Sequence, residues 1–118
     1  MIRFPRFYTF PLFLSLSPLS ILSNSREWYN RSMRQYEKPL KALANKRRLG
    51  IIKYLKENKE ATVGDIASHI KLSFKATSKH LAVLLSADIV EREQRSLSCF
   101  YSITPKPSPI ARAVISIV

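Results

Sequence analysis

A stretch near the middle of the chain combines small polar side chains with lysines at helical spacing. Residues 72–90 read LSFKATSKHLAVLLSADIV, and their polar and aliphatic positions separate onto two sides of a helix with about 3.6 residues per turn. Serine can hydrogen-bond to base edges, alanine can contact a thymine methyl group, and lysine neutralises phosphates. The pattern therefore predicts a helix suited to a nucleic-acid groove. Its predicted outward residues are Lys75, Ala76, Ser78, Lys79, Ala82 and Val83, and its predicted inward residues are Phe74, Thr77, Leu81, Leu84 and Leu85.

His80 lies beside Leu81 in this predicted helix and has two main interpretations. It is either a half-buried core histidine or a contact to a phosphate or base from the groove side. A metal-ligand role is the weakest interpretation, because the sequence offers this imidazole no partner ligands.

A second short helix is predicted just before this one, from about Thr62 to Ile70. Thr62 is placed to cap it, and Asp65 three positions later completes a capping-box pattern. Residues 71–73 form the turn, and the Ser73 hydroxyl caps the next helix. Two short helices joined by a tight turn indicate a helix-turn-helix.

Two strand-like segments follow, at residues 89–93 and 98–103, with a turn predicted over residues 94–97. In the second segment Cys99, Tyr101 and Ile103 alternate with Ser98, Phe100 and Ser102, and Cys99 is expected to face inward. Arg92 and Arg95 are expected to project from this hairpin, where they could reach a minor groove or flanking phosphates. The alternative is that these arginines are exposed charges that balance neighbouring glutamates.

The flanking segments carry apolar stripes at helical spacing. One consists of Tyr29, Met33, Tyr36, Leu40 and Leu43, and a last helix capped by Ser108 carries Ile110, Ala113, Val114 and Ile117. The first stripe covers either the domain's own core or a second subunit, and the pattern favours neither. Pro39 is expected to end or restart the first helix, so that a second helix runs from about Leu40 to Asn58. Arg48 lies near the apolar side of that helix and is expected to pair with an acid or a carbonyl group.

Composition limits the classes of function. The 118 residues suit one domain, and a net charge of +12 favours nucleic acid, acidic lipid or acidic protein as partner. Eleven of the twenty cationic residues lie between Arg26 and Lys59. One cysteine and two glycines leave no intrachain disulfide, zinc thiolate cluster or glycine-rich phosphate loop. We therefore predict no enzymatic site, no metal site and no cofactor, and a cytoplasmic location.

Residues 1–25 differ from the remaining chain, because two arginines precede an uncharged stretch rich in Phe, Leu and Ser. We predict a disordered tail, or sequence translated upstream of a true start at Met33, with residues 26–118 forming the domain. A weak membrane anchor and a cleaved secretory signal are the alternatives.

Three stretches of the chain resemble ArsR-type winged-helix transcriptional regulators. Residues 43–52 (LANKRRLGII) look like the family's Leu-Ala-Asp, Thr-Arg-Leu and Ile-Leu pattern, with Arg48 at its arginine. Residues 63–67 (VGDIA) resemble the Val-x-Glu-Leu-Ala that opens its first reading helix. The most specific likeness, to the recognition helix, lies in Leu-Ser at 72–73, Ser-Lys-His-Leu at 78–81 and Val-Leu at 83–84.

The resemblance implies a mainly α-helical fold with a small β-hairpin, a winged helix-turn-helix with N- and C-terminal dimerisation helices. It implies a homodimeric transcriptional regulator that binds double-stranded DNA. By matching position, DNA-facing roles fall on Ser73, Lys75, Ala76, Ser78 and His80, to which the residue argument adds Lys79, Arg92 and Arg95. The implied dimer interface contains Tyr29, Met33, Tyr36, Ile110 and Val114.

At several positions the chain differs from the family pattern, and these differences bear on metal sensing, base recognition and the shape of the wing. Thr62 and Gly64 stand where metal-sensing members have cysteines, and residues 108–118 contain no carboxylate or histidine ligand. Phe74 replaces a frequent glutamine that would read a base, and Ser96 replaces the usual glycine of the wing. The alternative hypothesis is a membrane-associated winged-helix interaction module, held by residues 1–25 and using its basic surface.

Overall fold

The structure is a computed structural model in which residues 18–118 are described, with side chains from residue 25 onward. The chain divides into two units, Met1–Gln35 and Tyr36–Val118. The predictions for residues 1–17 fall outside the described residues, whereas residues 18–25 form the beginning of a helix. The predicted domain boundary at residue 26 stays a prediction.

The first helix, α1 (Pro18–Leu43), does not end at Pro39 as predicted. Pro39 removes one backbone donor, but its ring is buried together with Ala42 and Leu43, and this burial compensates for the missing hydrogen bond. The break comes instead at Asn45, whose Oδ1 accepts hydrogen bonds from the backbone N of Arg47 at 2.9 Å and of Arg48 at 3.2 Å. The second helix, α2, therefore runs from Lys46 to Asn58.

A second helix that began at Leu40, as predicted, would place Leu40 and Ala44 on its inward side, but neither residue is buried. Leu40 belongs to α1 and is 49% exposed, and Ala44 lies exposed between the two helices. The prediction treated residues 40–58 as one continuous helix. The helix in fact breaks at Asn45, so the residues before Asn45 do not share the inward side of α2.

The helix-turn-helix forms as predicted, from α3 (Val63–Ile70) and α4 (Phe74–Ser86). Thr62 and Asp65 form the capping box, with the Thr62 Oγ1 accepting from the Asp65 N at 3.2 Å. Lys71 ends α3 in the left-handed conformation, with φ of 57°. Ser73 caps α4, its Oγ accepting from the Ala76 N at 3.1 Å.

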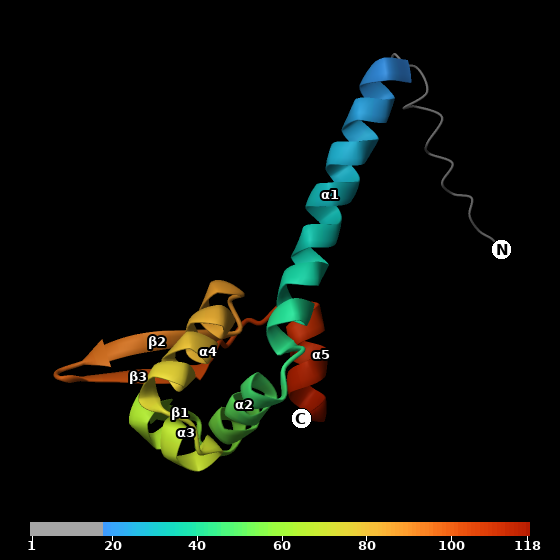
Figure 1. Ribbon diagram of the computed structural model, residues 1–118. Helices are drawn as coiled ribbons and strands as arrows, with labels where there is room; N and C mark the ends of the chain where they lie inside the picture. Colours follow the sequence, from blue (N-terminus) through green and yellow to red (C-terminus); the bar gives the residue numbers. More distant parts are fainter. Residues whose placement is uncertain (1–17) are drawn as a thin grey trace. The chain divides into compact units, whose positions relative to one another are not determined.

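A three-stranded antiparallel sheet adjoins these helices, in the order β1 (Glu60–Thr62), β3 (Ser98–Ile103), β2 (Val90–Arg95). β2 and β3 form a hairpin that extends beyond α4 (Figure 1). The predicted turn over residues 94–97 was too long, because Gln94 and Arg95 pair with Cys99 and Ser98 and only residues 96–97 turn. β1 was not predicted.

The core lies among α2, α3, α4 and the sheet. Its fully buried side chains include Ile52, Leu55, Ile66 and Leu81. Phe74, predicted to be inward, is 65% exposed instead, because it lies in the first turn of α4, beyond the part of the helix that covers the core. The last helix, α5 (Pro109–Ile117), has the predicted Ser108 cap, with the Ser108 Oγ accepting from the Ala111 N at 3.3 Å.

Candidate nucleic-acid interface

The outer side of α4 is basic and carries small side chains. Lys75 and Lys79 are exposed, and Ala76 and Ser78 are half-buried between them and the core. α4 contains no acidic residue. Because the partial positive charge at a helix N-terminus adds to that of lysines, the first turns of α4 attract anions.

His80 is half-buried and contacts Arg48. The Arg48 Nη1 lies 3.4 Å from the His80 Nδ1, while its Nε donates to the Ala42 carbonyl and its Nη2 to the Lys41 carbonyl at 3.3 Å. Burial lowers the pKa of His80 below 6.5, and the charges of Arg48 and then Arg47 lower it further. Arg48 thus binds carbonyl groups, as predicted, and it links the end of α1 to α4.

Two further basic residues of α2 bind carbonyl groups at the ends of other helices, as Arg48 does. The Arg47 Nη1 donates to the Ile70 carbonyl at 3.4 Å, at the end of α3. The Lys56 Nζ donates to the Ile115 carbonyl at 2.8 Å, near the end of α5. Cations at a helix C-terminus stabilise it, so these two charges support the ends of α3 and α5. All four of Lys46, Arg47, Lys53 and Lys56 are exposed, but Arg47 and Lys56 already have partners within the protein.

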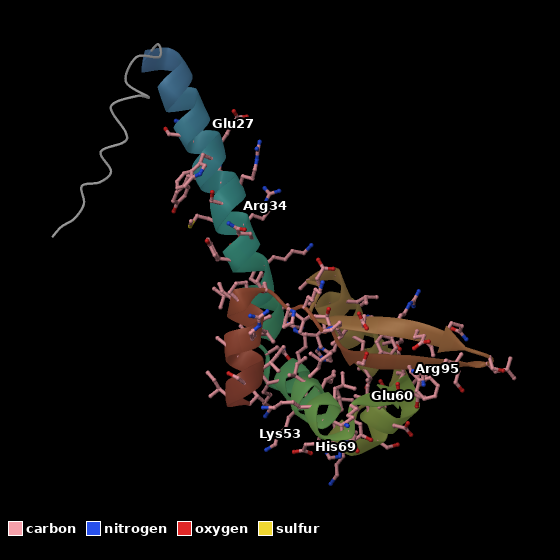
Figure 2. The ribbon with its side chains drawn as sticks, turned by 180° about the vertical axis from the view of Figure 1, so that it is seen from behind. Glu27, Arg34, Lys53, Glu60, His69 and Arg95 are labelled. Atoms are coloured by element: carbon pink, nitrogen blue, oxygen red, sulfur yellow. The ribbon has the colours of Figure 1, made fainter. Side chains whose placement is uncertain are left out.

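The two hairpin arginines, Arg92 and Arg95, differ in whether their charge is paired with an acidic side chain. The Arg95 guanidinium makes two parallel hydrogen bonds to the Glu60 carboxylate, at 2.7 and 2.8 Å, and a third to the Glu93 Oε1 at 2.9 Å. Figure 2 shows Glu60 and Arg95 adjacent to each other at the sheet. The Arg95 guanidinium also lies 4.8 Å from the centroid of the Phe100 ring. Hydrogen bonds from Arg95 lower the pKa of Glu60 below 4.5.

Arg92 is exposed and lies opposite Tyr101 on β3. Its pKa is raised, first by hydrogen bonding with the Tyr101 hydroxyl. No salt bridge involves Arg92 within the described part of the chain. Arg92 is therefore the hairpin arginine with a charge available to a partner.

The predicted dimer residues divide into exposed and half-buried groups. Tyr29, Met33 and Tyr36 on α1 are exposed, as is the neighbouring Trp28, which sequence reasoning did not single out. On α5, Ile110 and Val114 are half-buried and Val114 packs against the core. Sequence reasoning also missed the exposure of Leu97, at the tip of the hairpin.

The described part of the chain shows neither a membrane span nor a metal-binding cluster. No helix there is long and apolar enough to cross a membrane. No three His, Cys, Asp or Glu side chains gather there as metal ligands would. Cys99 is a free, half-buried thiol.

Comparison with known proteins places the chain in a family. Residues 45–92 match the model of the bacterial regulatory protein arsR family. The transcriptional activator HlyU of Vibrio cholerae is 40% identical over 65 residues, 55% of this chain and 59% of that protein. The arsenical resistance operon repressor of Bacillus subtilis is 30% identical over 71 residues, 60% of this chain and 68% of that protein.

A solved structure agrees with these matches. The homodimeric winged helix-turn-helix DNA-binding domain of Mb0332 from Mycobacterium bovis, described as a possible ArsR-family transcriptional regulator, superposes with a TM-score of 0.66 and 28% identity. The superposed region covers 75% of this chain and 80% of the Mb0332 domain. The predicted fold class, a mainly α-helical winged helix-turn-helix with a small β-hairpin, is confirmed, and β1 extends the hairpin to three strands. The predicted use of the N- and C-terminal helices for dimerisation stays a prediction. The chain belongs to the ArsR family of bacterial regulatory proteins.

Proposed function

We propose that this protein is a cytoplasmic, non-enzymatic transcriptional regulator that binds double-stranded DNA as a homodimer. The observation that carries the proposal is the outer side of α4, an acid-free helix with exposed Lys75 and Lys79 around Ala76 and Ser78. The hairpin of β2 and β3 adjoins this helix and carries Arg92. A helix presented beside a β-hairpin fits a major groove and the adjoining backbone.

The roles of individual residues follow from their environments. Lys75, Lys79 and Arg92 are free to neutralise phosphates, while Ala76 and Ser78 are short enough to contact base edges. The Ser73 Oγ accepts a hydrogen bond as the cap of α4, which leaves its O–H able to donate to a phosphate oxygen. His80 and Arg95 are engaged within the protein, and we assign them to positioning α4 and the hairpin.

The homodimer is supported by exposed apolar side chains on both terminal helices. α1 exposes Tyr29, Met33 and Tyr36, and α5 exposes Ile117. Exposed apolar surface of this kind is typical of interaction sites. We also assign the half-buried Ile110 and Val114 of α5 to the dimer interface. The Mb0332 domain is itself described as homodimeric. The comparisons give no support to the alternative of a membrane-associated module.

The salt dependence of DNA binding tests the proposed DNA surface. We expect the wild-type dimer to bind short duplexes with an affinity that falls steeply as salt is added. Lys79→Ala should weaken binding to all sequences about equally and reduce the slope of log K against log salt by about 0.9 per subunit. Ser78→Ala should leave that slope unchanged and alter the preference among sequences.

Lys106→Ala provides a matched control, because Lys106 is exposed but lies in the connection between β3 and α5. It should change the slope much less than Lys79→Ala. Equal effects of the two lysine substitutions would contradict the placement of DNA on α4. Selection from random duplexes that gave no enriched sequence would contradict specific regulation.

A further inference from the structure

The first turn of α4 exposes an aromatic ring that the core does not use. Phe74 follows the Ser73 cap directly and is 65% exposed, whereas Leu81 and Leu84 on the same helix are fully buried. Within the described part of the chain, Phe74 takes part in no ring stacking or cation contact. Phe74 is thus a large apolar side chain that the core leaves available to a partner.

The surroundings of Phe74 indicate which partner. Lys71 ends α3 just before it and Lys75 follows it, and both lysines are exposed. Ser73 and the first turn of α4, which contains no acidic residue, leave the positive end of the helix open to a phosphate. Lys71 and Lys75 would bind phosphates of the two DNA strands, and the Phe74 ring between them in the sequence would then lie against the bases. Another protein's apolar surface would offer these two lysines no phosphate.

The chemistry of a phenyl ring then limits what it can read. It has no donor or acceptor for the polar groups on base edges. The apolar group that a base presents in the major groove is the C5-methyl of thymine. In helix-turn-helix proteins the N-terminal residues of the second helix contact base edges, which is the position of Phe74 in α4.

We propose that Phe74 is a specificity-determining residue that packs against a thymine methyl group in the major groove of each half-site. This inference rests on the proposed function, because it names the base contact made by the same surface. Ala76 could also touch a methyl group, but its side chain is a single half-buried carbon, whereas the Phe74 ring extends outward from the helix start.

Replacing thymine by deoxyuridine tests the proposal, since it removes the methyl group and leaves every hydrogen bond of the base unchanged. A duplex selected by the wild-type protein at fixed salt would be substituted one thymine at a time. At one position per half-site we expect affinity to fall about fourfold, the value of burying one methyl group. Phe74→Ala should bind the thymine duplex about as weakly as the wild type binds the uracil duplex, and should no longer distinguish the two.

Two further measurements separate this contact from a general loss of binding. Phe74→Ala removes no charge, so its salt slope should equal that of the wild type. Val83→Ala is the matched control, because Val83 is also an exposed apolar residue of α4 but lies nine positions further along. Val83→Ala should still bind about fourfold more weakly when the thymine assigned to Phe74 is replaced by deoxyuridine.

The failure of this inference can be distinguished from failure of the proposed function. If the wild-type protein bound no duplex, the proposed function would itself be overturned. If it bound DNA but tolerated uracil at every thymine, or if Phe74→Ala kept the same uracil penalty, the methyl contact would be refuted while DNA binding stood. A dimer affinity reduced by Phe74→Ala would also refute it, because the ring would then serve a second subunit.

Discussion

Thr77 places a hydroxyl group where water cannot reach it. The residue is fully buried in α4, and its Oγ1 has no hydrogen-bond partner among the described residues. A buried polar group without a partner loses its hydration and gains nothing in return. This atom is therefore a local source of instability within an otherwise apolar core.

We expect Thr77→Val to raise the free energy of unfolding by about 1 kcal/mol, because a methyl group replaces the unpaired hydroxyl at nearly constant volume. Chemical denaturation measures this change. Thr62→Val is the informative counterpart, since it removes the cap of α3 and should lower stability by about 1 kcal/mol. A loss of stability in Thr77→Val comparable with that of Thr62→Val would show that the Thr77 hydroxyl has a partner after all.

His80 should make stability depend on pH in the weakly acidic range. Its pKa in the folded protein is lowered below 6.5, first by burial and then by Arg48. The unfolded chain therefore takes up a proton before the folded protein does, so the stability contributed by neutral His80 is complete above about pH 6.5. It is lost as the pH falls through the lower pKa of the folded state.

The prediction is that Arg48→Met raises the pKa of His80 toward 6.5 without reaching it, because the burial remains. NMR titration of the imidazole measures this pKa directly. His80→Gln cannot take up a proton, so its free energy of unfolding should fall less than that of the wild type between pH 7 and pH 5. An unchanged His80 pKa in Arg48→Met would show that the 3.4 Å contact carries no electrostatic weight.

At the scale of elements, one side-chain contact joins the two outer strands of the sheet. Glu60 begins β1 and Arg95 ends β2, and the two are joined by a double hydrogen bond although neither strand neighbours the other. Arg95 therefore spans β3 to fix the outer part of the hairpin to β1. Exposed ion pairs contribute little to overall stability, so the effect of this contact should be local.

We expect Arg95→Ala to return the pKa of Glu60 toward 4.5 and to increase amide exchange in the hairpin. The low pKa of Glu60 means that this link is complete above about pH 4.5 and is lost as the pH falls through the lowered value. Arg92→Ala is the matched control, because it removes the same charge from the same strand. If both substitutions shifted the Glu60 pKa equally, general charge rather than the direct contact would be responsible.

These elements also show how far sequence reasoning reaches. The caps at Thr62, Ser73 and Ser108 were predicted because a cap depends on residues within three positions of one another. β1 was missed because three residues become a strand only through pairing with β3, forty positions away. Phe74 was misplaced because periodicity treats every turn of a helix as equally covered, whereas the first turn of α4 extends past the core.

At the scale of the whole molecule, two properties bear on assembly. The net charge of +12 opposes self-association unless apolar contact outweighs it. Exposed apolar side chains on α1 and α5 supply such contact, and the Tyr36 side chain is 45% exposed in the unit that holds the winged helix-turn-helix. Dimerisation should then matter for DNA binding, because two subunits double the number of phosphate contacts.

We expect Tyr36→Glu to weaken dimerisation at least tenfold, because it removes an aromatic contact and places a charge in an apolar interface. Analytical ultracentrifugation measures the change in dimer affinity. Gln35→Glu introduces the same charge at the adjacent exposed position of α1 and should leave the dimer intact. At concentrations where Tyr36→Glu is monomeric, the slope of log K against log salt should fall to about half the wild-type value. If monomeric Tyr36→Glu kept the full slope, one subunit would make all the phosphate contacts and the proposed role of the dimer would be wrong.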